Sequence, residues 1–535
     1  MADQDKDQPA EHGSASPAEV SAGKPSFQEI EIKFRVDGKA VERILNSALL
    51  DGAKPGPARV LVSTYFDTAG NGLQQSGMTL RVRKKGRAIP VIGVKWSGET
   101  DEGLFARGEI EARCPGGLPD ITLFENAIQD RLNAALAGRP LVPVFETRVR
   151  RQLVMLRHGR SEIEVAIDEG VVAAGKAERP LAEIELELKS GNLPDLLACA
   201  RALALECRLT LELEPKSARG YRLAAAALPA PRKAKSLELP ATASFDDLVT
   251  AVTANTLSHF VANWGSLRES DAPESIHQLR VALRRMRAAL GMFRQAISLR
   301  ELEDIRAEAR RIASLLGPAR ECDAFRQNAL SGPLRGRREA LTGSVQLLAA
   351  VEDRRQDTYD AARRLIDHPS ASLFVLDIQD FLARRAWRTA LTPQDLGLLT
   401  SEARFFATDI LSKLHRRALK RGKTLPDMPD AERHELRIAL KKLRYAAEFF
   451  ASLFGGRKEV RGFIARVADL QEDLGAYNDA ATAESFIASL KLGQGGEASF
   501  AAGYLLGWYR HASMVADSHL ARKWKAFRQA DAFWE

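Results

Sequence analysis

The stretch Glu29-Ile30-Glu31-Ile32-Lys33-Phe34 alternates charged and apolar residues at every position. Because successive side chains of a β-strand point to opposite faces, this stretch predicts a strand with one ionic and one apolar face. The same alternation recurs at residues 78–83 and 183–188. For any one strand, the alternative is an ordinary solvated sheet. The set of strands favours a binding surface, because carboxylates pair on some ionic faces and guanidinium groups pair on others.

Short alternating runs of this kind, separated by turn signals, continue to about residue 224. Helical patterns interrupt them at residues 38–50, 121–137 and 192–206. We therefore expect residues 27–225 to form an α+β domain with mostly antiparallel strands.

The pattern changes after the Pro- and Lys-containing residues 226–244, which we expect to be a linker. Long segments rich in Ala, Leu and Arg with a 3.6-residue period predict an all-α domain over residues 245–535. Residues 1–26 are polar and low in aromatic side chains, which predicts a disordered tail.

The composition is that of a folded protein with two or more domains, because 45% of the 535 residues are apolar and 28% are charged. The net charge of +8 belongs to the part after the linker, since the first 225 residues are nearly neutral. A basic domain indicates an anionic partner such as nucleic acid, polyphosphate or anionic lipid. The sequence lacks both a membrane-spanning run of ~20 apolar residues and an apolar signal core, so we expect a cytoplasmic protein without membrane contact. The four cysteines form no CxxC pair and are predicted to be buried thiols.

The paired charges on the ionic faces point to phosphate chemistry. Like charges about 7 Å apart on one strand repel unless an opposite charge lies between them. Paired glutamates bind Mg²⁺ or Mn²⁺, which prefer carboxylate oxygens, and paired arginines bind phosphate oxygens. A face with both is what hydrolysis of a polyanionic phosphate chain requires. The sequence has no P-loop, HExxH motif or serine nucleophile elbow that would indicate a different hydrolase.

In these segments the chain resembles the CYTH superfamily, also called triphosphate tunnel metalloenzymes. Residues 29–33 match its ExExK signature, and the other segments of the family follow in order over residues 27–225. These segments are Thr64-Tyr65-Phe66-Asp67-Thr68, Leu80-Arg81-Val82-Arg83, Lys95, Arg107-Gly108-Glu109, residues 163–168, Glu183-Ile184-Glu185-Leu186-Glu187 and Lys216-Ser217-Ala218-Arg219-Gly220-Tyr221.

The resemblance implies an eight-stranded antiparallel β-barrel tunnel that binds a triphosphate lengthwise with Mg²⁺ or Mn²⁺. Lys33 is expected to bind phosphate and to help position or activate the attacking water, whereas Glu187 is expected to be an ion-pair partner. The implied metal ligands are Glu29, Glu31, Asp168, Glu183 and Glu185. The implied phosphate-binding residues are Arg81, Arg83, Lys95, Lys216 and one base among Arg148, Arg150 and Arg151, of which we select Arg151.

The helical part contains an internal repeat. A histidine followed by basic residues at fixed spacing occurs twice, and Leu316-Gly317 recurs as Leu474-Gly475. Two similar helical bundles in tandem explain this pattern. The first copy has His277, Arg280, Arg284, Arg285 and Arg287, and the second has His434, Arg437, Lys441, Lys442 and Arg444.

Helical spacing places the histidine and most of these bases on one face, opposite an apolar face. A solvated basic face is the alternative for a single helix. Its repetition with the same spacing favours binding of a repeating anion. Aromatic side chains that would stack on bases are missing from this face, which argues against single-stranded nucleic acid, whereas binding of a duplex through its phosphates stays open.

These segments resemble the CHAD domain, with residues 316–323 and 470–479 matching its other recurring elements. The resemblance implies two four-helix bundles, related by a pseudo-twofold axis, that bind inorganic polyphosphate along a basic surface. Further bases at residues 416–423 either extend this surface or form a solubilising loop. The implied polyphosphate-binding residues are His277, Arg280, Arg284, Arg287, His434, Arg437, Lys441 and Arg444.

The order CYTH then CHAD resembles bacterial inorganic triphosphatases. It implies a metal-dependent hydrolase that cleaves tripolyphosphate to pyrophosphate and phosphate, in a cytoplasmic protein associated with polyphosphate granules. The alternatives are a thiamine triphosphatase, a class IV-like adenylate cyclase, or a polyphosphate-binding protein without activity. Metal preference, physiological chain length, oligomeric state and coupling between the domains stay open at this point.

Overall fold

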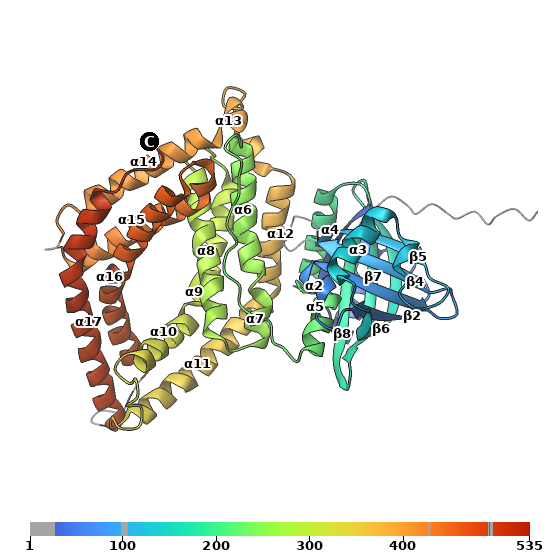
Figure 1. Ribbon diagram of the computed structural model, residues 1–535, viewed down its shortest axis with the longest axis horizontal. Coiled ribbons are helices and arrows are strands. Elements are labelled where there is room, and N and C mark those ends of the chain that lie inside the picture. The colour runs from blue at the N-terminus through green and yellow to red at the C-terminus, as the bar shows by residue number, and fades with distance from the viewer. Residues whose placement is uncertain (1–26, 98–104, 426–427, 491, 493–495) are drawn as a thin grey trace, which may run out of the picture.

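The computed structural model describes residues 27–97, 105–425, 428–490, 492 and 496–535. It contains a closed β-barrel followed by an all-helical region (Figure 1). The fold class predicted from the sequence is therefore confirmed. The predicted tail at residues 1–26 lies outside the described residues.

Eight of the described strands close the barrel, and all neighbouring pairs are antiparallel. Their order around the ring is β1-β5-β4-β3-β2-β6-β7-β8, and β8 pairs with β1 again. A short strand, β9 (Thr210–Leu211), pairs with the C-terminal end of β1. The barrel strands are β1 (Phe27–Arg35), β2 (Arg59–Asp67), β3 (Met78–Lys85), β4 (Val91–Ser97), β5 (Phe105–Arg113), β6 (Val142–His158), β7 (Ser161–Ala174) and β8 (Ala177–Ser190).

Helices between these strands confirm the three predicted helical patterns, and two further helices, at residues 72–75 and 216–224, were not predicted. They are α1 (Gly38–Leu45), η1 (Ala48–Leu50), α2 (Gly72–Gln75), η2 (Ile121–Leu123), α3 (Asn126–Leu136) and α4 (Leu193–Cys207), and α5 (Lys216–Ala224) follows β9.

The alternation of charged and apolar residues turns the apolar strand faces outward. Ile32 and Phe34 of β1 have no exposed surface and belong to one apolar cluster with α4. Leu80 and Val94 are equally buried in a second cluster with α3. Burial of each such side chain contributes roughly 1.5–3 kcal/mol to folding. Since the helices cover the apolar faces, the charged residues of the same strands point into the barrel.

The helical region consists of two sets of helices (Figure 1). The first comprises α6 (Phe245–Val261), α7 (Trp264–Glu269), α8 (Pro273–Phe293), α9 (Arg300–Leu315), α10 (Gly317–Ser331), α11 (Ser344–Ile366) and α12 (Pro369–Ala383). The second comprises η3 (Ala386–Ala390), α13 (Gly397–Thr400), α14 (Ala403–Arg421), α15 (Asp430–Phe450), η4 (Ala451–Leu453), α16 (Arg457–Ser489) and α17 (Glu497–Arg528).

The two copies of the repeat start side by side. Phe245 N donates a hydrogen bond to Ser401 O (2.9 Å), and Ala403 N donates one to Ala243 O (2.8 Å). The copies then differ at the repeated Leu-Gly pair. In the first copy α9 ends and α10 begins there, because Pro318 lacks a backbone N–H, whereas α16 runs through Leu474-Gly475 without a break.

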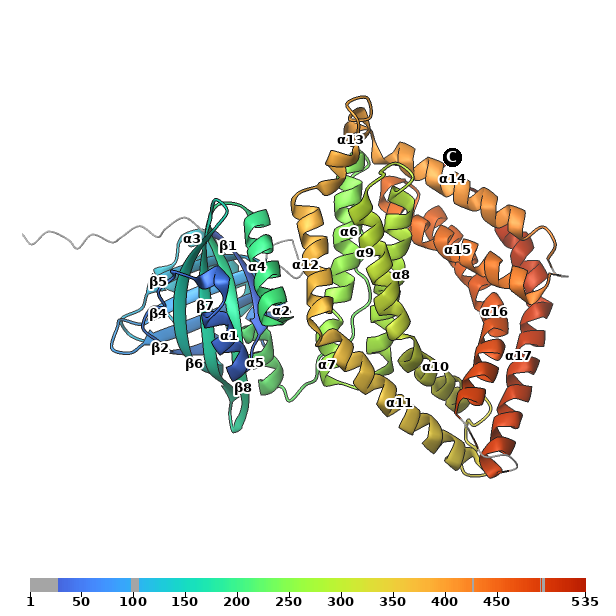
Figure 2. The same ribbon diagram turned by 180° about the vertical axis from the view of Figure 1, so that it is seen from behind.

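The stretch predicted as a linker runs along the helical region without regular secondary structure. Arg232 and Asn263 exchange two hydrogen bonds of 2.8 and 2.9 Å, and Leu239 N donates to Ser452 Oγ (2.9 Å). The barrel itself contacts the helical region mainly where α4 packs against α12 (Figure 2). Both helices contribute buried side chains to one continuous apolar cluster. None of the helices in the described part of the chain has the length and apolar character of a membrane span.

Candidate active site

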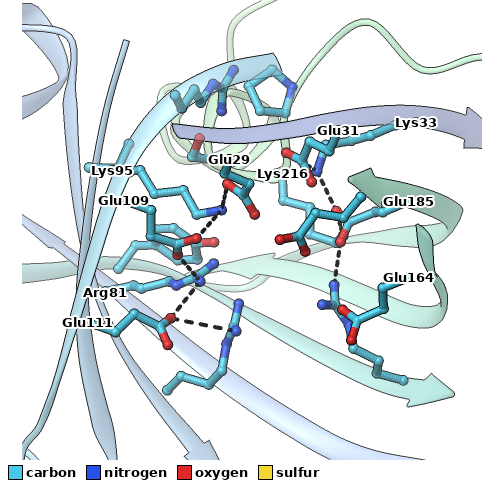
Figure 3. Close-up of a pocket in the computed structure, with 18 of the residues that line it drawn as sticks. Glu29, Glu31, Lys33, Arg81, Lys95, Glu109, Glu111, Glu164, Glu185 and Lys216 are labelled. Atoms are coloured by element: carbon cyan, nitrogen blue, oxygen red, sulfur yellow. Dashed lines mark hydrogen bonds and ion pairs between the residues drawn. The ribbon is translucent and has the colours of Figure 1, made fainter. Parts of the chain in front are cut away.

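The barrel encloses a cavity of about 220 Å³ whose lining is dominated by charged side chains (Figure 3). The uncharged lining residues are Tyr65, Thr79, Pro215 and Ser217. The charged ones are Glu29, Glu31, Lys33, Arg81, Arg83, Lys95, Arg107, Glu109, Glu111, Arg151, Glu164, Glu185, Glu187, Lys189 and Lys216.

One wall of the cavity carries glutamates on the adjacent strands β1 and β8. Glu31 lies directly opposite Glu187 in the strand register, so both point inward. Burial raises the pKa of Glu31; Lys33 opposes this, while the carboxylates of Glu185 and Glu29 add to it. Burial also raises the pKa of Glu187, and Glu29 adds to that shift. Lys33 contacts Glu31 at 2.9 Å and Lys189 contacts Glu187 at 2.6 Å, so both carboxylates have a cation partner in addition to their burial.

Another wall carries arginines on β3. Arg81 Nη2 binds Glu109 Oε1 (2.8 Å) and Glu111 Oε1 (3.1 Å) of β5. Arg83 Nε donates to Ser63 Oγ (3.2 Å), and its distance to Glu111 is 3.9 Å. Burial lowers the pKa of Arg83, and the positive charges of Arg81 and Arg151 lower it further. A bound anion near Arg83 would favour its charged form, because burial and the two neighbouring cations disfavour it.

Lys33 and Lys95 lie between the carboxylates of neighbouring strands (Figure 3). Lys33 Nζ contacts Glu31 Oε1 at 2.9 Å and also binds Glu185. Burial opposes the charged form of Lys33, yet Glu185 and Glu31 hold its pKa above the usual range. The two carboxylates therefore favour the ammonium form of Lys33. Lys95 binds Glu29 and lies 3.2 Å from Glu109 Oε2.

Asp168, Glu183 and Glu185 form an acidic cluster with oxygens within 4.8 Å of one another. Lys216 Nζ from α5 occupies this cluster, at 2.7 Å from Asp168, 2.5 Å from Glu183 and 2.7 Å from Glu185. Arg151 adds a two-pronged contact to Asp168 at 2.7 and 2.6 Å. Asp168 and Glu183 are fully buried and do not line the cavity. Their role as metal ligands stays a prediction, and it would require Lys216 to move away.

The residues of the glutamate wall fit a divalent cation. Glu31 and Glu187 have raised pKa values, and Glu29 and Glu185 complete the set of carboxylates on β1 and β8. Carboxylate oxygens are the donors that Mg²⁺ and Mn²⁺ prefer.

The structure decides between the three candidate arginines of β6. Arg151 lines the cavity, whereas Arg148 and Arg150 lie on the opposite strand face and pair with Glu178 (2.6 Å) and Glu169 (3.8 Å). Sequence reasoning did not assign Glu109, Glu111, Glu164, Glu187 and Lys189 to the site, although they line the cavity. Their alternation on strand faces was a signal, but the strand order that brings them together was not visible.

The basic faces of the two repeat copies meet where α8 packs against α15. Burial lowers the pKa of Lys441 to about 7, and the charges of Arg437 and Arg284 contribute. Burial also lowers the pKa of Arg437, which is affected by Arg284 as well. Arg284 of the first copy is therefore close enough to repel the cations Arg437 and Lys441 of the second copy. These cations form one basic surface, called the α8–α15 face below.

In both repeat copies, the first arginine of the α8–α15 face packs against the glycine of the repeated Leu-Gly pair. A Cβ on Gly317 would lie 3.3 Å from Arg280 Nη1, and one on Gly475 would lie 3.5 Å from Arg437 Nη2. His277 adds no charge at neutral pH, because burial and Arg320 lower its pKa to about 4. His434 Nδ1 lies 3.2 Å from Asn478 Oδ1. The repeated spacing in the sequence thus corresponds to repeated local geometry.

Two family models match the chain, one over the barrel domain and the other over the helical region. The CYTH domain model matches residues 28–221, and the CHAD domain model matches residues 251–488. Among solved structures, the CHAD domain from the plant Ricinus communis is 28% identical, with a TM-score of 0.47; the match covers 57% of this chain and 98% of that chain.

Two curated proteins are similar to the chain. An inorganic triphosphatase of Haemophilus influenzae is 33% identical over 170 residues, which are 30% of this chain and 46% of that protein. The chain thus matches less than half the length of this relative. A protein of Mycobacterium tuberculosis described as uncharacterized is 26% identical over 468 residues, covering 80% of this chain and 83% of that protein. The chain therefore carries a CYTH domain, which belongs to the triphosphate tunnel metalloenzyme superfamily, followed by a CHAD domain.

Proposed function

We propose that the barrel hydrolyses inorganic tripolyphosphate to pyrophosphate and phosphate, with Mg²⁺ or Mn²⁺ bound. The observation that carries this proposal is the barrel cavity, in which carboxylates of β1 and β8 lie across from arginines and lysines of β3, β4 and β6. A metal–phosphate complex offers a cation to the carboxylates and anionic oxygens to the bases. The similarity of the CYTH domain to a protein named inorganic triphosphatase supports the same substrate class.

The lining of the cavity favours a substrate made of phosphates alone. Arg81, Arg83, Lys95 and Arg151 approach from three different strands and can contact several phosphate groups of one chain. Tyr65 is the single aromatic residue among the described lining residues, and it stacks on Phe145 at 4.4 Å between ring centroids. An adenine or thiamine group would find few apolar surfaces here, which weighs against a cyclase or a thiamine triphosphatase.

In the proposed reaction, water attacks the terminal phosphorus, the bridging P–O bond breaks, and pyrophosphate leaves. A divalent cation at Glu29, Glu31, Glu185 and Glu187 would withdraw charge from the phosphate oxygens. Lys33, held between Glu31 and Glu185, contributes a fixed positive charge next to this position. The proton that the water loses can pass to a phosphate oxygen of the products.

We propose that the helical domain binds inorganic polyphosphate on the α8–α15 face. Several cations of this face have lowered pKa values because burial and neighbouring bases disfavour their charged forms. An anion with regularly spaced charges relieves this repulsion at several positions. Arg287 and Arg444 continue the face on α8 and α15.

The test is phosphate release by the purified protein with Mg²⁺ or Mn²⁺, offered tripolyphosphate, ATP, thiamine triphosphate and long-chain polyphosphate in parallel. We expect release from tripolyphosphate that EDTA abolishes and that is much slower from the two organic triphosphates. A protein that binds polyphosphate but releases no phosphate from any substrate would contradict the proposal. Faster release from ATP or from thiamine triphosphate would show that this compound, and not tripolyphosphate, is the preferred substrate.

A further inference from the structure

One segment of the barrel domain contributes side chains to the lining of the cavity. Both of its ends contact the helical domain. This segment, called the strap below, comprises residues 210–224, from β9 to the end of α5. Pro215, Lys216 and Ser217 in its middle line the cavity.

The first end of the strap lies between β1 and α12. Leu211 pairs with Phe34 of β1, and the next residue, Glu212, donates its backbone N–H to Lys33 O (2.8 Å). On its other side, Leu211 N donates to Ser372 Oγ of α12 (2.8 Å), and Ser372 is fully buried. Two hydrogen bonds, made by the adjacent residues Leu211 and Glu212, therefore connect Ser372 of the helical domain to the backbone of Lys33.

The second end of the strap is held by an ion-pair group. Arg222 of α5 contacts Glu269 at the end of α7 with both Nη atoms, at 3.0 and 3.1 Å. The same guanidinium binds Glu214 of the strap with two contacts of 2.6 Å. Glu269 thereby fixes α5, whose first residue is Lys216.

We propose that the helical domain positions the two cavity lysines, Lys33 and Lys216, by holding both ends of the strap. The two ammonium groups share Glu185, and each approaches it from an element that the strap fixes. Their separation therefore depends on where the strap lies. This inference rests on the proposed hydrolysis, because it assigns Ser372 and Glu269 as positioning residues for that reaction.

The test compares Ser372→Ala and Glu269→Gln with the control Asp377→Asn. Asp377 of α12 also joins the domains, through a 2.7 Å contact to Arg201 of α4, but no described residue of α4 lines the cavity. We expect both test variants to lower kcat for tripolyphosphate about tenfold and also to raise KM, because displaced lysines slow the reaction and hold the phosphate chain less tightly. Asp377→Asn is expected to match the wild type, and Glu269→Asp, which keeps the carboxylate, to regain part of the rate.

Polyphosphate binding is expected to be unchanged in all variants, because the α8–α15 face is not altered. Wild-type kcat in both test variants, or an equal loss in Asp377→Asn, would overturn the proposal. If Ser372→Ala fails to fold, Glu269→Gln decides.

A second measurement separates this inference from the proposed function. Tripolyphosphate binding is measured by calorimetry in EDTA, where no turnover is needed. Weaker binding in the test variants than in Asp377→Asn supports the positioning role even if the wild type shows no hydrolysis. Equal affinities in all variants contradict it.

Discussion

Individual residues inside the barrel differ in how well their charge is balanced. Lys216 has three carboxylate partners within 2.7 Å, and Arg151 makes two contacts to Asp168 and a third to Glu185 (2.6 Å). Glu31 and Arg83, in contrast, have pKa values shifted against their charged forms. A bound metal and phosphate chain would therefore favour the charged forms of Glu31 and Arg83 most.

Glu31→Gln tests this distinction. It removes a carboxylate proposed to hold the metal, while Lys33 keeps its contact with Glu185, so we expect the rate of tripolyphosphate hydrolysis to fall by ~10² or more, with little loss of stability. Phosphate release and thermal unfolding measure the two effects. Glu169→Gln is the control, because Glu169 pairs with Arg150 outside the cavity. A Glu31→Gln variant that is folded and fully active would remove Glu31 from the mechanism.

Lys441 gives polyphosphate binding a dependence on pH. Its pKa is lowered to about 7 in the folded protein, chiefly by burial. A bound phosphate favours the ammonium form, so binding is coupled to proton uptake and weakens as the pH rises from 7 to 9. Each unit of pH costs at most about tenfold in affinity for one proton. Titration of polyphosphate at several pH values measures this slope.

Lys441→Arg is the matched control for this pH effect. Arginine stays charged throughout the range, so the slope should become smaller than in the wild type. The ionisation of polyphosphate itself is common to both proteins and cancels in the comparison. Equal slopes would show that Lys441 does not take up the proton.

At the level of elements, α5 is fixed to the barrel by very close packing. A Cβ on Gly220 would lie 2.1 Å from the ring of Phe145 on β6. That ring cannot move away, because it stacks on Tyr65 and contacts Tyr221 edge-on at 5.2 Å between centroids. Tyr221 also donates a hydrogen bond to the buried Asp67 (2.8 Å). The glycine thus allows α5 to approach the barrel and to bring Lys216 into it.

Gly220→Ala should therefore destabilise the protein by roughly 1–3 kcal/mol, as measured by chemical denaturation. Gly38→Ala is the control, since nothing lies within 4 Å of a Cβ at the start of α1. The control should be neutral or slightly stabilising. A Gly220→Ala protein of wild-type stability would show that α5 can shift, and its kcat would then report how far Lys216 moves.

On the scale of the whole molecule, the two domains are separate in chemistry but joined in structure. The cavity is lined by residues of the barrel domain, and the α8–α15 face belongs to the helical domain. A shared apolar cluster and the strap connect them.

The combined substitution of Arg280, Arg284, Arg437 and Lys441 by glutamine tests the division of labour. We expect polyphosphate binding to be lost, because several phosphate contacts disappear together, while tripolyphosphate hydrolysis stays within about twofold of the wild type. Binding and phosphate release are measured on the same preparation. Loss of both activities in a folded variant would contradict the separation of the two sites. Residual binding with an unchanged dependence on salt would place the polyphosphate elsewhere.

The amino-acid sequence alone determined the local features of this protein. The period of two in stretches such as residues 29–34 fixes which side chains share a strand face, because side-chain direction depends on neighbours along the chain. The period of 3.6 and the repeat after residue 245 likewise predict helices with basic faces. These local patterns predicted an antiparallel α+β domain and an all-α domain, whereas the family resemblance implied the eight-stranded barrel and nine of the 19 residues that line the cavity.

Tertiary structure alone decided which charges meet. Lys33 and Glu185 are 152 positions apart, and their contact depends on the register between β1 and β8. The same holds for Lys216 within the acidic cluster, for Arg151 rather than its neighbours, and for the contacts of Ser372 and Glu269 with the strap. Electrostatic energies depend on distance and burial, and both are set by residues that are remote in the sequence.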